Sequence, residues 1–348
     1  MEIPYCELNA GKFGYSTRVM NPPPAEAKRN VIQFSLTEGC SHSACTFCDM
    51  YHKNEYQVKS LSEFKQHVNS VLGSFSFSKS ILKQISRVFV GAGNALSVDT
   101  EILKQATQYA LLKTKNATGR IPTLLAIYGN TKDIIKQGAE GLKYLRCGGT
   151  CFGSCSKEFL GDRRGVEVVY WGLESGNSEV LKMAGKGYNK EDITKAFDCL
   201  FQSSMRTSIM IIPGLGGIKY FDQHIKDTVG VLNDNLANIQ WITFMGLEIG
   251  ENTPYARIIE KECEKGKNRN LTPAEIVEQT ARIIELLNFN STIGIHGKDV
   301  HPKGYNPIAI GTYEINYNSS AQQLANQLRT EAKKKLLLKQ SKLEKILD

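Results

Sequence analysis

Short apolar runs alternate with longer amphipathic stretches along most of the chain. The runs are rich in β-branched and aromatic residues, which is typical of buried strands. We predict strands at six of these runs: Val31–Leu36, Arg87–Val90, Thr123–Tyr128, Val166–Gly172, Thr207–Ile212 and Ile239–Leu247. Helical periodicity between them predicts helices at Ser62–Leu72, Thr100–Leu112, Ile134–Leu145, Lys190–Gln202 and Tyr220–Leu232.

This alternation predicts the fold class. Parallel strands joined by right-handed helical crossovers form a sheet with helices packed on it. We therefore expect an α/β fold, a partial (β/α)6 TIM-like barrel with a helical C-terminal extension. Such folds place their chemistry at the C-terminal ends of the strands. The residues that directly follow each apolar run are the first candidates for a functional site.

Three segments are expected along the chain. Residues 1–29 form a lead-in segment, because their Pro22-Pro23-Pro24 run suits neither a helix nor a central strand. Residues 30–255 form the barrel, with a Cys-rich insertion at 147–165. Residues 256–348 form the C-terminal extension.

The extension has its own pattern. We expect a linker after Tyr255, then a helix that starts at Pro273 and runs to Leu287. From Ala321 onward, leucines and lysines predict a basic amphipathic helix that suits a nucleic acid or another acidic surface. The alternative is a terminal helix docked on the barrel with its lysines in solvent.

Composition excludes some classes of protein. Of 348 residues, 41% are hydrophobic and 22% are charged, and no apolar run approaches the ~20 residues that a membrane span needs. Nine cysteines without a recognisable secretory signal favour a reducing compartment, so we expect a cytoplasmic protein. The net charge of +8 permits an acidic partner but is also consistent with ordinary solvated lysines.

The strongest chemical signal is a cysteine motif directly after the first predicted strand. Cys40, Cys45 and Cys48 have the spacing C-x4-C-x2-C. Three thiolates can hold a cubane iron-sulfur cluster and leave one iron open to a small molecule, whereas a structural zinc needs four ligands. A zinc site completed by His42 or Cys6 is the alternative. A disulfide is disfavoured because the number of cysteines is odd and their spacing is short.

Glycine-rich or polar residues follow four other predicted strands. Each loop by itself is a common strand-to-helix turn, but all occur at the same phase of the strand-helix repeat as the cysteine motif. The loops are Gly91-Ala-Gly93-Asn94, Tyr128-Gly-Asn130, Gly172-Leu-Glu174-Ser175-Gly176 and Pro213-Gly214-Leu-Gly216-Gly217.

These motifs together resemble the radical S-adenosylmethionine (radical SAM) superfamily, over about residues 30–255. The resemblance is carried by Thr46-Phe47-Cys48, by Val169–Gly176 and by Ser208–Gly217. It is closest to the branch of oxygen-independent coproporphyrinogen oxidase, Elongator subunit-3-like and methylthiotransferase-like proteins. The sequence departs from that pattern in two places: the first cysteine gap has four residues, where three is usual, and Asn94 stands where many members have an acidic residue.

The resemblance implies a radical SAM enzyme with an unidentified substrate. It implies a [4Fe-4S] cluster on Cys40, Cys45 and Cys48, SAM as cofactor, and an electron donor such as a flavodoxin or ferredoxin. The SAM-contacting residues that it implies are Phe47, Gly91, Gly93, Asn94, Tyr128, Asn130, Glu174, Ser175, Ile211 and Phe244. Ile211 and Phe244 are equally consistent with barrel core.

A second cysteine group lies in the predicted insertion. Cys147, Cys151 and Cys155 form C-x3-C-x3-C in a glycine-rich stretch. One interpretation is an auxiliary iron-sulfur cluster, and the other is a flexible insertion whose thiols face solvent or the barrel exterior. Two further hypotheses remain for the whole chain: an iron-sulfur electron-transfer or scaffold protein without SAM chemistry, and a zinc-dependent nucleic-acid-binding protein.

Overall fold

The structure, a computed structural model, describes residues 31–48, 55–74, 82–91, 93–147, 165–236, 239–250, 253–288 and 308–310. A seven-stranded sheet has the order β1-β4-β5-β6-β7-β8-β9. Its strands are β1 (Val31–Ser35), β4 (Arg87–Gly91), β5 (Leu124–Gly129), β6 (Val168–Glu174), β7 (Arg206–Ile211), β8 (Ile239–Phe244) and β9 (Ile308–Ile310). A two-residue antiparallel pair, β2 (Thr37–Glu38) with β3 (Gln57–Val58), lies outside this sheet.

The predicted α/β class is confirmed. All six predicted strands are present, and the pairs from β1 to β6 and between β8 and β9 are parallel. The expected number of strands was too small, because β9 pairs with β8 in the C-terminal part of the chain. Such a short strand has too few residues to show an apolar run in the sequence.

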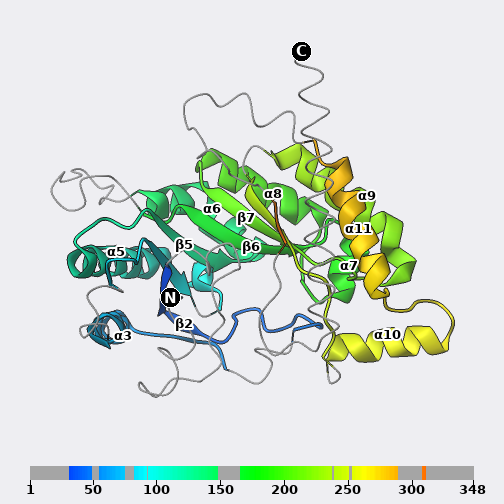
Figure 1. Cartoon of the computed structure of the whole chain (residues 1–348), viewed down its shortest axis with the longest axis horizontal. Helices are drawn as coiled ribbons and strands as arrows, with labels where there is room; N and C mark the ends of the chain where they lie inside the picture. Colours follow the sequence, from blue (N-terminus) through cyan, green and yellow to red (C-terminus); the bar gives the residue numbers. More distant parts are fainter. Residues whose placement is uncertain are drawn as a thin grey trace, which may run out of the picture. The chain divides into compact units, whose positions relative to one another are not determined.

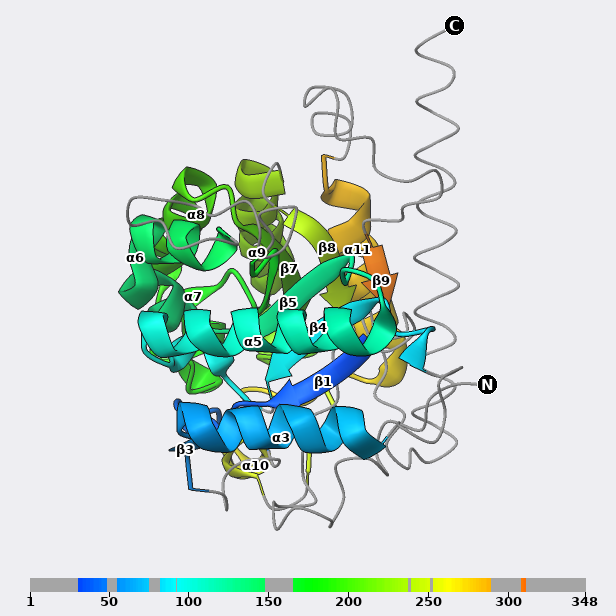
Figure 2. The same ribbon diagram turned by 90° about the vertical axis from the view of Figure 1, so that its left-hand side faces the viewer.

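The chain divides into two compact units. Unit 1 comprises residues 1–43, 50–171 and 195–207. It contains β1, β4, β5 and the helices α3 (Leu61–Ser74), α5 (Thr100–Thr118) and α6 (Thr131–Arg146). Figure 2 shows α3 and α5 side by side along these strands, and both pack on them. β1, at the edge of the sheet, and β4, beside it, are buried at every position, as is usual for strands of a parallel sheet.

Unit 2 comprises residues 44–49, 172–194 and 208–348. Its helices are α7 (Ser178–Met183), α9 (Phe221–Asn235), α10 (Pro254–Glu264) and α11 (Pro273–Leu286). Helices α9 and α11 pack against each other (Figure 1). Helix α8 (Lys190–Gln202) and strand β6 each have residues in both units.

Helix starts follow their capping residues. Asp99 caps α5, Asn130 caps α6 and Asn177 caps α7 through side-chain oxygens that accept backbone N–H groups. Thr272 and Glu275 form a reciprocal capping box at the start of α11, with Pro273 at the first helical position. The predicted start of α11 is thus confirmed.

One expectation about the C-terminal region was wrong. The stretch after Tyr255 is not a linker, because α10 begins at Pro254 and runs to Glu264, capped by Thr253. The proline that interrupts the strand pattern is at the first turn of this helix, where its missing N–H costs nothing. The lead-in segment 1–29, Cys151, Cys155 and the basic segment from Ala321 lie outside the described residues. Among the described helices, none is both long and apolar enough to cross a membrane.

Candidate cofactor site

Cys40 lies in unit 1, at the end of the chain segment that leaves β1. The backbone of Gly39 is in close contact with Gly93, which follows β4 and has φ +134°. A Cβ atom on Gly93 would lie 2.0 Å from the Gly39 carbonyl oxygen. Only glycine fits there, so the loop after β4 holds the backbone next to Cys40.

Asn94 joins the cysteine segment to helix α6. Its side-chain Nδ2 donates to the Ser41 Oγ at 2.8 Å and to the carboxylate of Asp133. Asp133 lies in the first turn of α6, and its backbone N–H donates to the Asn130 side chain at 3.0 Å. Burial raises the pKa of Asp133, and the hydrogen bond from Asn94 opposes this shift.

Tyr56 adds a phenol to the same neighbourhood. Its hydroxyl is hydrogen-bonded to the Ser97 Oγ at 2.5 Å, and Ser97 donates to the Asn94 carbonyl at 2.6 Å. Burial raises the pKa of Tyr56, and the nearby acids Asp133 and Cys40 add to this shift. Unit 1 therefore brings hydroxyl, amide and carboxylate groups together next to Ser41, the residue after the first cysteine.

The segment with Cys45 and Cys48 belongs to unit 2, where Thr46 fixes it. The Thr46 N–H donates to the Ala184 carbonyl at 3.0 Å, and its hydroxyl donates to the Met183 carbonyl at 2.8 Å. The Tyr255 N–H donates to the Thr46 carbonyl at 3.0 Å. The two thiols are thus carried on a backbone bonded to the end of α7 and to the start of α10.

A buried ion pair lies beside this segment. Glu174 at the end of β6 and Lys186 are 3.2 Å apart, with side chains only 9% and 7% exposed. Burial raises the pKa of Glu174. Burial also acts to lower the pKa of Lys186, but the acids Tyr188, Glu174 and Cys45 raise it overall, so the ammonium stays charged near Cys45.

Glu174 has two unusual features. Its backbone φ is +63°, a left-handed conformation that costs free energy in a non-glycine residue. Its Oε2 is buried and lacks a hydrogen-bond partner among the described residues. Strained backbone and an orphan carboxylate oxygen are typical of ligand sites.

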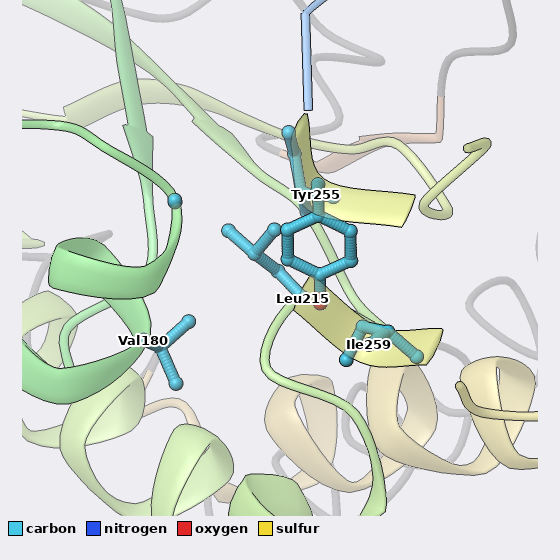
Figure 3. Close-up of a cluster of buried hydrophobic side chains, with 6 residues drawn as sticks. Val180, Leu215, Tyr255 and Ile259 are labelled. Carbon is cyan, nitrogen blue, oxygen red and sulfur yellow. The ribbon is translucent and has the colours of Figure 1, made fainter. Parts of the chain in front are cut away.

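Phe47 borders an apolar cluster in unit 2. The cluster consists of buried residues from α7 and its C-terminal end, the loop after β7, and α10, namely Val180, Ala184, Ile212, Leu215, Tyr255 and Ile259. Figure 3 shows Tyr255 next to Leu215 within it. The Tyr255 hydroxyl accepts the Gly216 N–H at 2.8 Å, and Gly214, Gly216 and Gly217 all have positive φ. The loop after β7 is therefore an ordered glycine turn that packs on an apolar cluster.

Other predicted contact residues lie in packed surroundings. The ring of Tyr128 packs on Phe89 at 4.8 Å between centroids. The hydroxyl of Ser175 accepts the N–H of Asn177 at 3.0 Å, which shapes the turn before α7. Gly91, Ile211 and Phe244 are buried in their strands, β4, β7 and β8. Contact of these residues with SAM stays a prediction.

Cys147 is the described member of the second cysteine group. It follows α6, its N–H donates to the Lys143 carbonyl at 3.1 Å, and its carbonyl accepts from the buried ammonium of Lys104. It precedes the N-terminal end of β6, whereas Glu174 lies at the other end of that strand. A second cluster stays a prediction.

The donor chemistry of the main motif fits a thiolate-bound cluster. Cys40, Cys45 and Cys48 are half-buried, lie in a loop and take part in no disulfide among the described residues. Soft thiolates suit iron-sulfur iron. Among the described residues, no three His, Cys, Asp or Glu side chains are placed to hold a metal ion, so the ligand set stays a prediction.

Sequence reasoning missed several residues of this region. Asp133 and Ser41 contact Asn94, Lys186 pairs with Glu174, and Tyr255 bonds both Thr46 and Gly216. The acidic residue three positions after Asn130 was a visible signal for a capped helix start. Nothing in the sequence pairs Lys186 with Glu174.

The fold is similar to several solved structures. The radical SAM methyltransferase TsrM from Kitasatospora setae, solved with cobalamin and a [4Fe-4S] cluster, matches with TM-score 0.49 and 13% identity over 89% of this chain and 62% of TsrM. The cobalamin-dependent SAM radical enzyme OxsB, solved with SAM, matches with TM-score 0.49 and 12% identity over 90% of this chain and 47% of OxsB.

Coproporphyrinogen III oxidase (HemN) from Escherichia coli matches with TM-score 0.45 and 15% identity over 74% of this chain and 52% of HemN. All three are radical SAM enzymes. The chain spans less than two thirds of the length of each of them. No protein family and no curated protein matches the sequence.

Proposed function

We propose that this protein is a radical SAM enzyme. Cys40, Cys45 and Cys48 hold a [4Fe-4S] cluster, and the remaining iron is left for SAM. When bound, the cluster supplies one electron to the sulfonium of SAM, which yields methionine and a 5′-deoxyadenosyl radical that abstracts hydrogen from the substrate. The electron comes from a one-electron donor such as a flavodoxin or ferredoxin.

The donor set carries this proposal. Three cysteines lie within nine residues, directly after the first strand of a parallel sheet, on a loop held by hydrogen bonds. Parallel α/β sheets present ligand sites at these strand ends. Three closely spaced soft ligands suit a cluster with an open coordination site better than a closed structural ion.

The chain's own residues have the chemistry to bind and orient SAM. The charged Lys186 beside Cys45 suits a carboxylate, and the unpartnered Oε2 of Glu174 suits a hydroxyl or N–H donor. Phe47 and the apolar cluster on which it packs suit an adenine ring. An apolar base also keeps water from a reactive radical.

Anaerobic reconstitution tests the proposal. We expect about four iron and four sulfide per chain at this motif and 5′-deoxyadenosine released from SAM under reductant. The C40A, C45A and C48A variants should lose the bound iron and the cleavage of SAM, whereas C199A in helix α8 should retain the iron and the cleavage. Iron with no SAM cleavage would identify an electron-transfer protein, and bound zinc without iron would identify the zinc-binding alternative.

The second cysteine group needs a separate measurement. If Cys147, Cys151 and Cys155 hold an auxiliary cluster, wild-type iron should reach about eight per chain. The triple variant C147A/C151A/C155A should then return to about four while SAM cleavage at the first cluster persists. Equal iron in both proteins would exclude the auxiliary cluster.

A further inference from the structure

The side-chain amide of Asn94 is buried between the cysteine segment and α6, and only its nitrogen is hydrogen-bonded to described residues. Asn94 is 5% exposed, and its Nδ2 donates to Ser41 and to Asp133. Its Oδ1 is buried and has no hydrogen-bond partner among the described residues. Leaving a buried acceptor unpaired costs free energy, so such an atom points to a missing donor.

A second orphan oxygen lies nearby. Thr37 is fully buried, and its Oγ1 has no partner among the described residues. This oxygen lies 3.6 Å from where a Cβ on Gly93, the residue before Asn94, would be. The Asn94 Oδ1, the Thr37 Oγ1 and the Asp133 carboxylate can all accept hydrogen bonds. A ligand with several N–H donors and a positive charge would satisfy them.

Asp133 is the carboxylate bonded to this amide. Lys136 on the same helix and His42 in the cysteine segment act to lower the pKa of Asp133, while Asp133 and Cys40 both act to raise the pKa of Tyr56. Asp133 is 8% exposed, so its charge is poorly screened by water. Its hydrogen bond also fixes the orientation of the Asn94 amide, because an ionised carboxylate can only accept, so the amide must turn its N–H₂ group toward Asp133.

We infer that Asp133 is a positioning residue for the ammonium group of SAM. The Asn94 Oδ1 accepts an N–H of that group, and Asp133, held on the other side of the same amide, supplies the negative charge and orients Asn94. The inference rests on the proposed function. It assigns to a residue of α6 a role that the strand-end motifs do not contain.

Binding measurements on the reconstituted protein test this role. SAM and 5′-methylthioadenosine, which lacks the amino-acid part, are titrated calorimetrically into wild type and D133N. The asparagine can still accept from Asn94, so only the charge is lost. We expect D133N to weaken SAM binding by about tenfold to a hundredfold, the range for a hydrogen bond to a charged group, and to leave methylthioadenosine binding unchanged.

A swapped variant separates charge from structure. N94D/D133N keeps one carboxylate and one amide in contact and should bind SAM nearly as well as wild type. D99N, which changes an exposed helix cap in α5, is the matched control and should bind both ligands normally.

Three results would overturn the inference. D133N could bind SAM as tightly as wild type, it could lose the same affinity for SAM and for 5′-methylthioadenosine, or it could fail to hold iron. The last result would mean that Asp133 serves only to hold the cysteine loop. If the wild-type protein itself does not hold iron or bind SAM, the result contradicts the proposed function, on which the role of Asp133 rests. Melting temperatures of the metal-free proteins, read alongside, should be alike for wild type and D133N.

Discussion

The Lys186 ammonium lies 3.2 Å from the Glu174 carboxylate, and both side chains are buried. Removing one partner leaves the other charge without compensation in a poorly solvated site. We expect K186M to reduce the free energy of unfolding by about 3–5 kcal/mol, measured by urea denaturation of the metal-free protein.

The double variant E174L/K186M provides the control for this pair. Replacing both charges by apolar groups should restore most of the lost stability. The exposed pair Arg282–Asp222 is the comparison, and R282A should cost about 1 kcal/mol or less. An equally small cost for K186M would show that the Glu174–Lys186 pair is solvated in the protein.

Gly93 should not tolerate a side chain. In G93A, the new Cβ would collide with the Gly39 carbonyl and the backbone would have to leave φ +134°, so the cysteine segment must move. We expect G93A to lose most of its iron on reconstitution. G230A, in helix α9 with open space around the new Cβ, should keep its iron and gain about 0.5–1 kcal/mol in stability.

The Tyr255 hydroxyl accepts the Gly216 N–H in a fully buried position. In Y255F that N–H loses its partner, and we expect a loss of about 1–3 kcal/mol in urea denaturation. Y220F, which removes a half-buried hydroxyl in the same unit, should change stability by less. A neutral effect of Y255F would mean that water replaces the lost acceptor.

Stability should fall in mild acid because of two buried histidines. Burial lowers the pKa of both His67 and His224 to about 4, and the His67 Nε2 accepts the Ser35 N–H and so must stay unprotonated. The unfolded chain binds protons near pH 6.5 and the folded chain does not. Stability is therefore complete above pH 6.5 and is lost as the pH falls toward 4, by about 3 kcal/mol for each histidine.

Urea denaturation of the metal-free protein between pH 7 and pH 4.5 measures how the free energy of unfolding changes with pH. H67Q keeps an acceptor for the Ser35 N–H but does not titrate, so it should show a shallower decline. A decline as steep as that of wild type would show that His67 is protonated in the folded chain.

Most of the secondary structure could be predicted from the pattern of apolar positions. Helix α8 was predicted at its observed bounds, Lys190–Gln202, because its apolar residues recur every three to four positions. Helix α10 was missed, since Pro254 breaks the preceding strand pattern and also begins a helix. In short segments such as β9, periodicity has too few residues to be detected.

The sequence suggested only some of the residues in the candidate site. Cys40, Cys45, Cys48, Asn94 and Glu174 were proposed as candidates because they follow strands. Their partners were not, because Asp133 is 39 residues from Asn94 and each lies in its own strand-helix repeat.

By itself, the sequence determined the order of strands and helices, the position of the thiols after β1 and the glycine turns, because these depend on local periodicity and on backbone conformations that few residues adopt. Tertiary structure alone decided that Lys186 pairs with Glu174, that Asp133 bonds Asn94 and that Thr46 bonds Ala184. Those contacts depend on how crossovers bring distant strand ends to one edge of the sheet, and burial then fixes their charges and hydrogen bonds.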